Sequence, residues 1–343
     1  MSTTIIEIAQ KAGVSIATVS RAFTQNSSIH PDTRRKILRI AEENHYKPNP
    51  SARSLSSKRT DTIGVVLPEL VDEFFSEIIR GIDEEAYKSQ HYVLVASSHS
   101  QRNVLETVLE FMFSGRVEGV ILMVPQLQNE FIKLISRSKR PVVLIDAPKN
   151  INQVVSFNIN NFQGAYSVVE HIINHGYKKV GIIIGPEGNC DSDERFRGFS
   201  HALKKYNLPL DQDFIIRGDF TYRSGYYSFI RLMSQNKKPD AIFATNDMMA
   251  LGIYEAARNS QIKIPQDVAI VGFDDIFSSR LLQPRLTTVH VPISELGSSA
   301  VRYLFKMING EVDLHKPCRN ELTTGLVIGG SCGCPISNAQ IIF

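Results

Sequence analysis

From residue 63 onward, short apolar runs alternate with longer amphipathic stretches in a rhythm that few folds accommodate. The runs are rich in Val, Ile and Leu and too short for buried helices, whereas the stretches between them carry a helical period. Near-continuous apolar strands separated by helices are typical of parallel sheets covered on both faces. About 280 residues with this rhythm suit two doubly wound α/β lobes with a cleft between them. The predicted strands are 63–67, 92–96, 119–124, 142–145, 154–157, 180–184, 241–244 and 268–272.

The first 60 residues differ from the rest in charge. They hold ten Lys and Arg against four Asp and Glu, a net charge of +6, whereas the remaining residues hold 28 against 31, a net charge of −3. A compact basic segment attached to a slightly acidic body indicates a polyanion partner for the N-terminus.

This basic segment has the pattern of a helix-turn-helix. Apolar residues at 5, 8, 9 and 12 form one face of a first helix, Gly13 breaks it, and Ser15 can cap a second helix over 16–23. A third helix begins at His30-Pro31. Small hydroxyls for phosphates, one Arg for a guanine edge and small apolar groups for thymine methyls lie on the outward face of the second helix. These candidate DNA contacts are Ser15, Ile16, Ala17, Thr18, Ser20 and Arg21.

Residues 48–60 predict a hinge. An Asn followed by Pro opens a segment with Ala52 and Leu55 three positions apart, and a helix of about two turns is marginal in water by itself. We expect it to form only against a partner or DNA, where Leu55 could wedge into a minor-groove step.

Polar residues follow three of the predicted strands. Asp146, Asn246 and Asp274 each stand at a strand end, where open parallel sheets bind ligands. Carboxylates and amides there suit a polyol, as does the bidentate guanidinium of Arg195. The aromatic side chains that would cover the apolar face of a sugar ring are Phe74, Phe75 and Phe220. The alternative is that each polar residue only caps the helix that follows it.

Several function classes find no support in the sequence. There is no phosphate-binding Gly-Lys-Ser/Thr loop, no Gly-x-Gly-x-x-Gly after a strand and no paired-His metal motif, so we expect neither an enzyme nor a cofactor. Cys332 and Cys334 are too close for an ordinary disulfide and no Cys or His pair completes a zinc pattern, so we expect four free thiols with Cys190 and Cys318, and no metal. A signal peptide and a membrane-spanning run are also absent, which predicts a cytoplasmic protein.

Beyond these patterns, the motifs resemble the lactose-repressor (LacI/GalR-type) family of bacterial transcription regulators. The resemblance covers the whole chain and rests on IAQKAGVSIATVSR at 8–21, NHYKPN at 44–49 with ARSL at 52–55, ATNDMMALG at 244–252, VGFDD at 271–275 and PRLTTV at 284–289. It implies a head at 1–47, a hinge at 48–60 and a body at 61–343 like that of periplasmic sugar-binding proteins.

The resemblance also implies roles for single residues. Ile16, Ala17 and Arg21 would read bases, Ser15, Thr18 and Ser20 would hold phosphates, and Leu55 would be the minor-groove lever. Thr24 and His30 depart from the residues usual in the family, Asn and Ser. The implied effector contacts are Phe74, Phe75, Asp146, Arg195, Phe220, Asn246 and Asp274.

Such a protein would be a repressor that binds a pseudo-palindromic operator as a homodimer, switched by a small sugar or similar effector. Control by a phosphorylated carrier protein as corepressor is the alternative; a transport binding protein would lack the basic head. The resemblance implies three crossings between lobes, near 157–160, 284–289 and 317–319. These give an N-lobe of about 61–157 and 289–317 and a C-lobe of about 160–284 and 320–343.

Overall fold

The chain divides into two compact units, residues 1–61 and 62–343. In this computed structural model the described residues are 3–23, 29–46, 60–70, 72–99, 101–123, 135, 138, 140–149, 154–314, 316–335 and 341–342.

The first unit is a three-helix head. Its helices are α1 (Ile5–Ala12), α2 (Ile16–Ala22) and α3 (Pro31–Glu43). Thr4 caps α1 and Ser15 caps α2, each by accepting a hydrogen bond from the backbone N–H three residues on. Val19 and Ala22 of α2 are buried and pack with apolar residues of the other two helices, among them Ile8 and Ile37. The second unit contains two lobes, each built on its own sheet.

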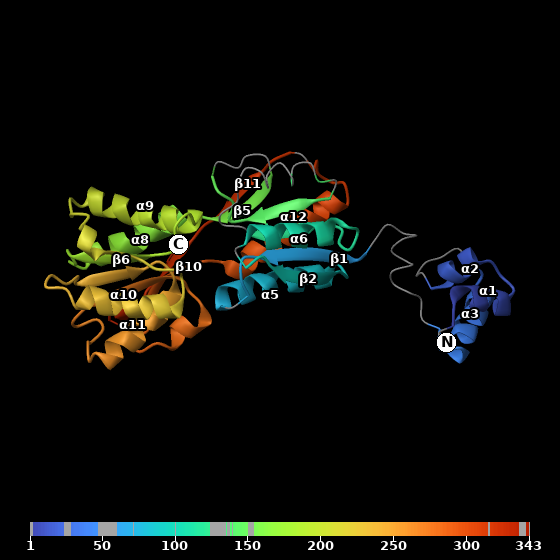
Figure 1. Cartoon of the computed structure of the whole chain (residues 1–343), viewed down its shortest axis with the longest axis horizontal. Helices are drawn as coiled ribbons and strands as arrows, with labels where there is room; N and C mark the ends of the chain where they lie inside the picture. Colours follow the sequence, from blue (N-terminus) through green and yellow to red (C-terminus); the bar gives the residue numbers. More distant parts are fainter. Residues whose placement is uncertain are drawn as a thin grey trace. The chain divides into compact units, whose positions relative to one another are not determined.

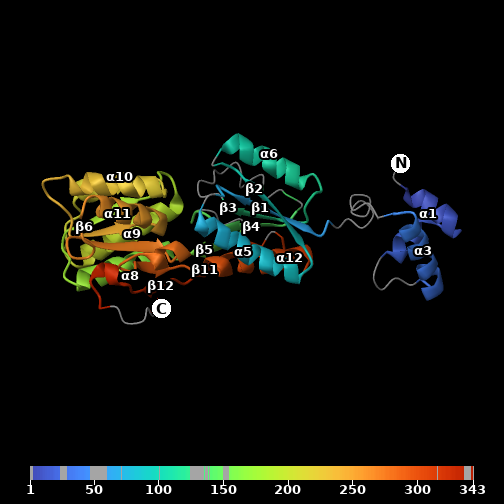
Figure 2. The same cartoon turned by 90° about the horizontal axis from the view of Figure 1, so that it is seen from below.

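The N-lobe has a six-stranded sheet in the order β11-β5-β4-β3-β1-β2. Helices α5 and α12 cover one face and α6 covers the other (Figures 1 and 2). The elements are β1 (Thr62–Leu67), α5 (Glu73–Lys88), β2 (Tyr92–Ser97), α6 (Arg102–Phe113), β3 (Val120–Met123), β4 (Val142–Ile145), β5 (Val155–Ile159), α12 (Ile293–Ile308) and β11 (Arg319–Leu322).

The C-lobe has a seven-stranded sheet in the order β13-β12-β10-β9-β8-β6-β7. Helices α8 and α9 cover one face, and α10 and α11 cover the other (Figure 2). The elements are α8 (Asn161–Asn174), β6 (Val180–Ile184), α9 (Cys190–Lys205), η1 (Gln212–Phe214), β7 (Ile215–Arg217), α10 (Tyr222–Met233), β8 (Ala241–Ala244), α11 (Asp247–Asn259), β9 (Ala269–Asp274), η2 (Phe277–Leu281), β10 (Thr287–His290), β12 (Gly325–Val327), η3 (Gly330–Cys332) and β13 (Ile341–Ile342).

The predicted fold class, a helix-turn-helix head with a two-lobed α/β body, is confirmed. Each of the eight predicted apolar runs is a strand. Within each lobe the first five strands in sequence follow the doubly wound order 2-1-3-4-5, which brings the carboxyl ends of parallel strands to one edge. The sheets are not wholly parallel, however, because β12 pairs antiparallel with both β10 and β13.

Two of the three crossings between the lobes lie a few residues further along the chain than the predicted positions. Strand β10 pairs with β9 in the C-lobe, so the second crossing, predicted near 284–289, follows His290. Strand β11 pairs with β5 in the N-lobe, so the third crossing, predicted near 317–319, follows Leu322. Both strands are rich in polar residues, which is why their sequences suggest connections. The first crossing comes between β5 and α8, at Asn160.

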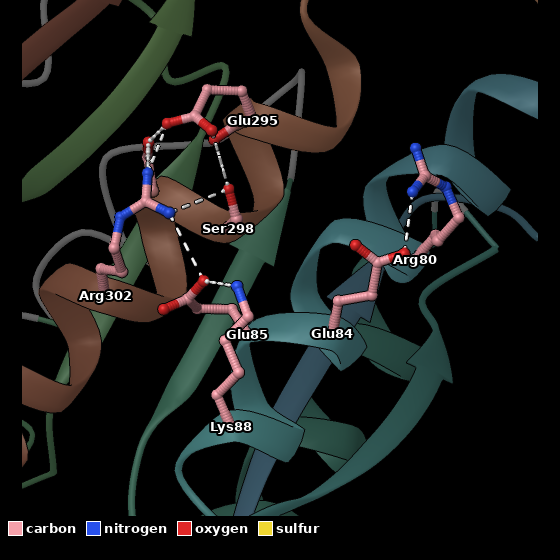
Figure 3. Close-up of polar contacts among 8 residues, drawn as sticks. Arg80, Glu84, Glu85, Lys88, Glu295, Ser298 and Arg302 are labelled. Atoms are coloured by element: carbon pink, nitrogen blue, oxygen red, sulfur yellow. Dashed lines mark hydrogen bonds and ion pairs between the residues drawn. The ribbon is translucent and has the colours of Figure 1, made fainter.

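Helices α5 and α12 pack closely in the N-lobe because glycines lie at their contact. A Cβ on Gly81 would lie 2.0 Å from the carbonyl oxygen of Ser294, and one on Gly297 would lie 2.5 Å from the carbonyl oxygen of Ile78. At the surface, Arg302 of α12 extends toward Glu85 of α5, with Nη1 and Oε2 3.5 Å apart (Figure 3). Exposed ion pairs of this kind contribute little, so the backbone approach holds the pair together.

We predict that Gly81→Ala destabilises the body by about 1–3 kcal/mol, because the methyl group would force α5 and α12 apart. Urea unfolding measures the loss. Ser76→Ala, on the exposed side of the same helix, is the matched control and should leave stability nearly unchanged. Equal stability of Gly81→Ala and the wild type would show that the helices have room to separate.

Candidate functional site

The head presents a polar and small-residue surface along α2. Ser15, Ile16, Ala17, Ser20 and Arg21 are exposed, and Thr18 is half-buried. The Ser15 Oγ accepts from the Thr18 amide at 3.1 Å and lies 2.8 Å from the Thr18 hydroxyl, so both residues also fix the start of the helix. Arg21 lies in the last turn, where its Nε donates to the Ala17 carbonyl at 3.3 Å. The six predicted contacts in the head therefore share one helix.

Of the other predictions about the basic segment, the structure describes the one for His30. His30 does cap α3, with Nδ1 accepting from the Asp32 amide at 3.4 Å, so it fills the position where the family usually has Ser. Leu55, the hinge at 48–59 and Thr24 lie outside the described residues.

In the body, Arg195 of α9 is the centre of a buried polar cluster at the strand ends. Its side chain is 4 % exposed, and its Nε donates to Asn161 at the start of α8 at 2.8 Å. Its Nη1 donates to the Thr245 carbonyl at 2.5 Å and lies 3.4 Å from a carboxylate oxygen of Asp274. The guanidinium also stacks on Phe273, 3.8 Å from the ring centroid. Four different segments of the C-lobe therefore meet at one side chain.

Asp274 and Asp146 each keep a buried oxygen that accepts no hydrogen bond among the described residues. Burial raises the pKa of Asp274 well above its usual range, although Arg195 opposes the shift. Burial also raises the pKa of Asp146, and the nearby charge of Asp191 adds to the effect. Buried polar atoms are nearly always hydrogen-bonded, so these two oxygens at strand ends are candidates to accept a hydrogen bond from a ligand.

The backbone at three of the seven predicted effector residues is left-handed. Asp146 has φ 49°, Phe220 φ 68° and Asp274 φ 113°. Such conformations are costly for residues other than glycine and gather at ligand sites. The neighbouring Asp275, with φ 58°, continues the turn after β9.

The structure shows which of the three polar residues at the strand ends cap a helix. Asn246 caps α11, with Oδ1 accepting from the Met249 amide at 3.0 Å, and its Nδ2 also holds the Phe220 carbonyl. Asp274 caps no helix, since the η2 helix that follows it has no side-chain cap. The Asp146 Oδ1 accepts from the Ile159 amide at the end of β5, again not a helix. The capping alternative therefore holds for Asn246 alone.

The aromatic residues approach this cluster from two sides. Phe220 lies 5.8 Å from the Arg195 guanidinium. Phe74 and Phe75 form an edge-to-face pair at the start of α5, with centroids 5.6 Å apart. Asp72, which caps α5, is close enough to Asp274 to raise the pKa of that carboxyl. The start of an N-lobe helix therefore faces the C-lobe strand ends.

Sequence reasoning missed several members of the cluster. Asn161 and Asp191 both belong to it, with the Asn161 Nδ2 donating to Asp191 at 2.9 Å. Asp191 precedes Arg195 by four residues, so helical spacing could have indicated that they share a face. Nothing in the sequence marks Asn161, because its role depends on the packing of α8 against α9.

A small pocket opens beside this cluster. It is lined by residues from both lobes, among them Asn160, Asn161, Cys190, Asp191, Glu194 and Arg319. None of the seven predicted effector residues lines it. We place the candidate site at the Arg195 cluster, because the buried oxygens of Asp146 and Asp274 and the left-handed turns lie there, and regard the pocket as its flank.

Several hydrogen-bonded contacts join the lobes around the cluster, among them one from the Cys190 thiol of α9 to the Asp146 carbonyl, 3.6 Å apart. The Ser278 amide of η2 donates to Glu73 of α5 at 3.0 Å, and the Ser278 hydroxyl bonds the same carboxylate. Lys149, which follows β4, donates to Glu194 of α9 at 2.6 Å. The lobes are thus closed over largely buried polar residues.

A basic helix-turn-helix head and a two-lobed body with a polar cluster between the lobes define a DNA-binding regulator with a ligand-binding type of body. The sequence matches the family model described as bacterial regulatory proteins, lacI family, over residues 4–49, and that of the periplasmic binding protein-like domain over residues 169–332. Catabolite control protein A of Priestia megaterium is 34 % identical over 312 residues, 91 % of this chain and 94 % of the relative. The chain belongs to the lacI family of bacterial regulatory proteins.

Other relatives agree with this assignment. The HTH-type transcriptional repressor PurR of Actinobacillus pleuropneumoniae is 30 % identical, covering 95 % of this chain and 97 % of the relative. The Lac repressor dimer bound to operator and the anti-inducer ONPF superposes with a TM-score of 0.86 at 25 % identity, covering 97 % of this chain and 99 % of that one. The regulator CelR in complex with cellobiose gives a TM-score of 0.74 at 27 % identity, covering 96 % and 99 %. The protein is therefore a DNA-binding transcription regulator of the repressor class, not an enzyme.

The described helices include none that is both long and apolar enough to cross a membrane.

Asp247, at the start of α11, gives the cluster a measurable pH dependence. It is fully buried, and burial raises the pKa of its carboxyl to about 7, opposed by the hydrogen bond from Thr288 at 2.6 Å. Because the unfolded-state pKa is about 3.9, the folded state holds the proton over a wider range. Its contribution to stability is full below pH ~4 and is lost as the pH rises toward about 7.

We predict that the wild type loses about 2 kcal/mol of stability relative to Asp247→Asn between pH ~5 and ~8, since the Asn side chain does not titrate. Urea unfolding of both proteins at each pH gives the difference. The exposed Asp193→Asn should show a curve parallel to the wild type. A constant difference between wild type and Asp247→Asn would contradict the raised pKa.

Proposed function

We propose that this protein is a cytoplasmic homodimeric repressor that binds a pseudo-palindromic operator through α2 and is switched by a sugar or sugar-like effector between its lobes. The observation that carries the effector site is the buried cluster around Arg195, where Asp146 and Asp274 each have an oxygen that accepts no hydrogen bond among the described residues. No metal or cofactor is needed for this function.

The chemistry of the cluster suits a polyol. The guanidinium offers a planar fork of donors, the carboxyl groups exchange hydrogen bonds with hydroxyls, and phenylalanine rings cover the apolar face of a sugar. The solved structure of CelR contains cellobiose, which supports the same class of ligand here. The proposed contacts are Phe74, Phe75, Asp146, Arg195, Phe220, Asn246 and Asp274.

The proposed switch is a shift between closed and open lobes. Glu73 with Ser278 and Lys149 with Glu194 favour the closed arrangement, and an effector favours whichever arrangement it binds more tightly. One arrangement lets the paired hinges of a dimer fold on the operator, with Leu55 as the wedge in its central step. The Lac repressor structure, a dimer bound to operator and an anti-inducer, supports this organisation.

Control by a phosphorylated carrier protein stays an alternative prediction. A screen of the isolated body, residues 61–343, against sugars and sugar phosphates by thermal shift separates the two, because a protein corepressor needs no small ligand in the cleft.

We predict that Arg21→Ala costs about 1–3 kcal/mol on the cognate operator and relaxes the preference at one base pair per half-site, since a guanine contact is lost. Operators selected from a random pool, with each half-site position varied, allow the affinities to be measured by fluorescence anisotropy.

The control is Arg39→Ala, an exposed arginine of α3 that pairs with Glu43 at 3.5 Å. It should change affinity by a similar factor on all sequences. A uniform loss for Arg21→Ala as well would make Arg21 a phosphate contact.

We predict that Arg195→Lys and Asp274→Asn each weaken effector binding by about 10–100-fold, the loss expected for a hydrogen bond to a charged group. Operator affinity without effector should be unchanged. Calorimetry with the sugar found in the screen measures binding, and anisotropy measures DNA affinity.

Arg197→Lys is the matched control, because Arg197 lies on the same helix but is exposed and pairs with Glu194. Unchanged calorimetric affinity in both cluster variants would remove Arg195 and Asp274 from the site.

A further inference from the structure

Two histidines and two cysteines meet on the C-lobe, away from the cleft. His171 lies in the last turns of α8 and His175 caps that helix, while Cys332 ends η3 and Cys334 follows it. One potential ligand atom from each residue lies within 4.8 Å of all the others. No zinc pattern is recognisable in the sequence because some 160 residues separate the histidines from the cysteines. The His-x₃-His spacing alone indicates that two histidines lie on one face of a helix.

The distances between these atoms match a tetrahedral site. His171 Nε2 lies 3.4 Å from Cys332 Sγ and 3.7 Å from Cys334 Sγ, and His175 Nε2 lies 3.1 Å from Cys334 Sγ. Bonds of about 2.3 Å to sulfur and 2.0–2.1 Å to nitrogen in a tetrahedron put the two ligand atoms about 3.6 Å apart. An ion would therefore need only small side-chain adjustments.

The segment that carries the two cysteines is fixed by contacts outside the ligand atoms. The Ser331 hydroxyl donates to the Ile270 carbonyl of β9 at 2.5 Å and accepts from the Thr287 amide at 2.7 Å. The Tyr177 hydroxyl donates to the Cys332 carbonyl at 3.1 Å, and Gly333, with φ 89°, turns the chain so that Cys334 faces the helix. Such a scaffold holds the ligands in position before an ion arrives.

We propose that His171, His175, Cys332 and Cys334 form a Cys₂His₂ site for Zn²⁺ that fastens the segment 330–335 to the end of α8. Thiolate and imidazole ligands favour zinc over Mg²⁺ or Ca²⁺, and four protein ligands make a closed, structural site. Binding to two thiols and two neutral imidazoles releases two protons, and the resulting complex is neutral, which suits the burial of Cys332.

The site is distinct from the proposed effector cleft. His171 lies ten residues along α8 from Asn161, about 15 Å at 1.5 Å per residue, and Asn161 is the residue that bonds Arg195. Loss of zinc therefore leaves the effector contacts in place, and the two sites can be tested separately.

The test is a titration of the full chain, reduced and stripped with a chelator, with Zn²⁺ alone against a chromophoric competitor. We expect one ion per chain with a dissociation constant well below micromolar. Replacing Zn²⁺ by Co²⁺ should give the visible bands of a tetrahedral ion and the near-ultraviolet band of thiolate coordination. Cys334→Ser and His175→Ala, the less buried ligands, should each weaken binding by more than about 100-fold, the upper range for losing an outer partner.

Cys318→Ser is the matched control, because Cys318 is a partly buried cysteine outside the cluster, and it should bind Zn²⁺ like the wild type. A measurement without variants is alkylation followed by peptide mass analysis, in which Zn²⁺ should protect the partly exposed Cys334 but not Cys318. Equal affinity of Cys334→Ser and wild type, an octahedral Co²⁺ spectrum without the thiolate band, or alkylation unaffected by Zn²⁺ would each overturn the proposal.

Discussion

The burial of the charged Arg195 guanidinium is the constraint on which the arrangement of the body depends. A cation that is 4 % exposed must find polar partners inside the protein. It finds two hydrogen-bond acceptors, the Asn161 side chain of α8 and the Thr245 carbonyl after β8, and one carboxylate, that of Asp274 at the end of β9. Those three partners reach it only if the sheet has the strand order observed and α8 packs on α9. The need to pair this one side chain therefore links the strand order of the C-lobe to the position of the polar cluster between the two lobes.

The excess of carboxylates around Arg195 determines how readily the acidic groups of the site hold their protons. Asp146, Asp191 and Asp274 are all buried, and one arginine cannot compensate them, so burial raises the pKa of each, that of Asp191 to about 6. Such groups hold protons more readily than surface carboxylates and can both donate to and accept from a hydroxyl.

How many strands can be predicted from the sequence depends on how apolar each strand is. Seven of the eight predicted strands rich in Val, Ile and Leu lie inside a sheet, and the eighth, β2, lies at an edge. In contrast, β11 (Arg319–Leu322) alternates exposed and half-buried residues and β10 holds buried threonines. The Thr287 hydroxyl bonds Gly329 and that of Thr288 bonds Asp247, partners that lie far along the chain. Asp274 and Arg195 could be chosen from sequence as candidates, but the link through Asn161 and the meeting of His171 with Cys334 depend on tertiary packing.

The interleaving of the two lobes has a consequence for synthesis on the ribosome. The head ends with α3 and is contiguous in sequence, but the N-lobe sheet lacks an edge until β11 emerges, and the C-lobe sheet needs β12 after that. At about 5–20 residues per second, some 14–55 seconds pass between the end of the head and the end of β11. For that interval the nascent chain carries a complete helix-turn-helix sequence in front of two unfinished sheets, so the DNA-binding head is complete well before the body to which it is attached.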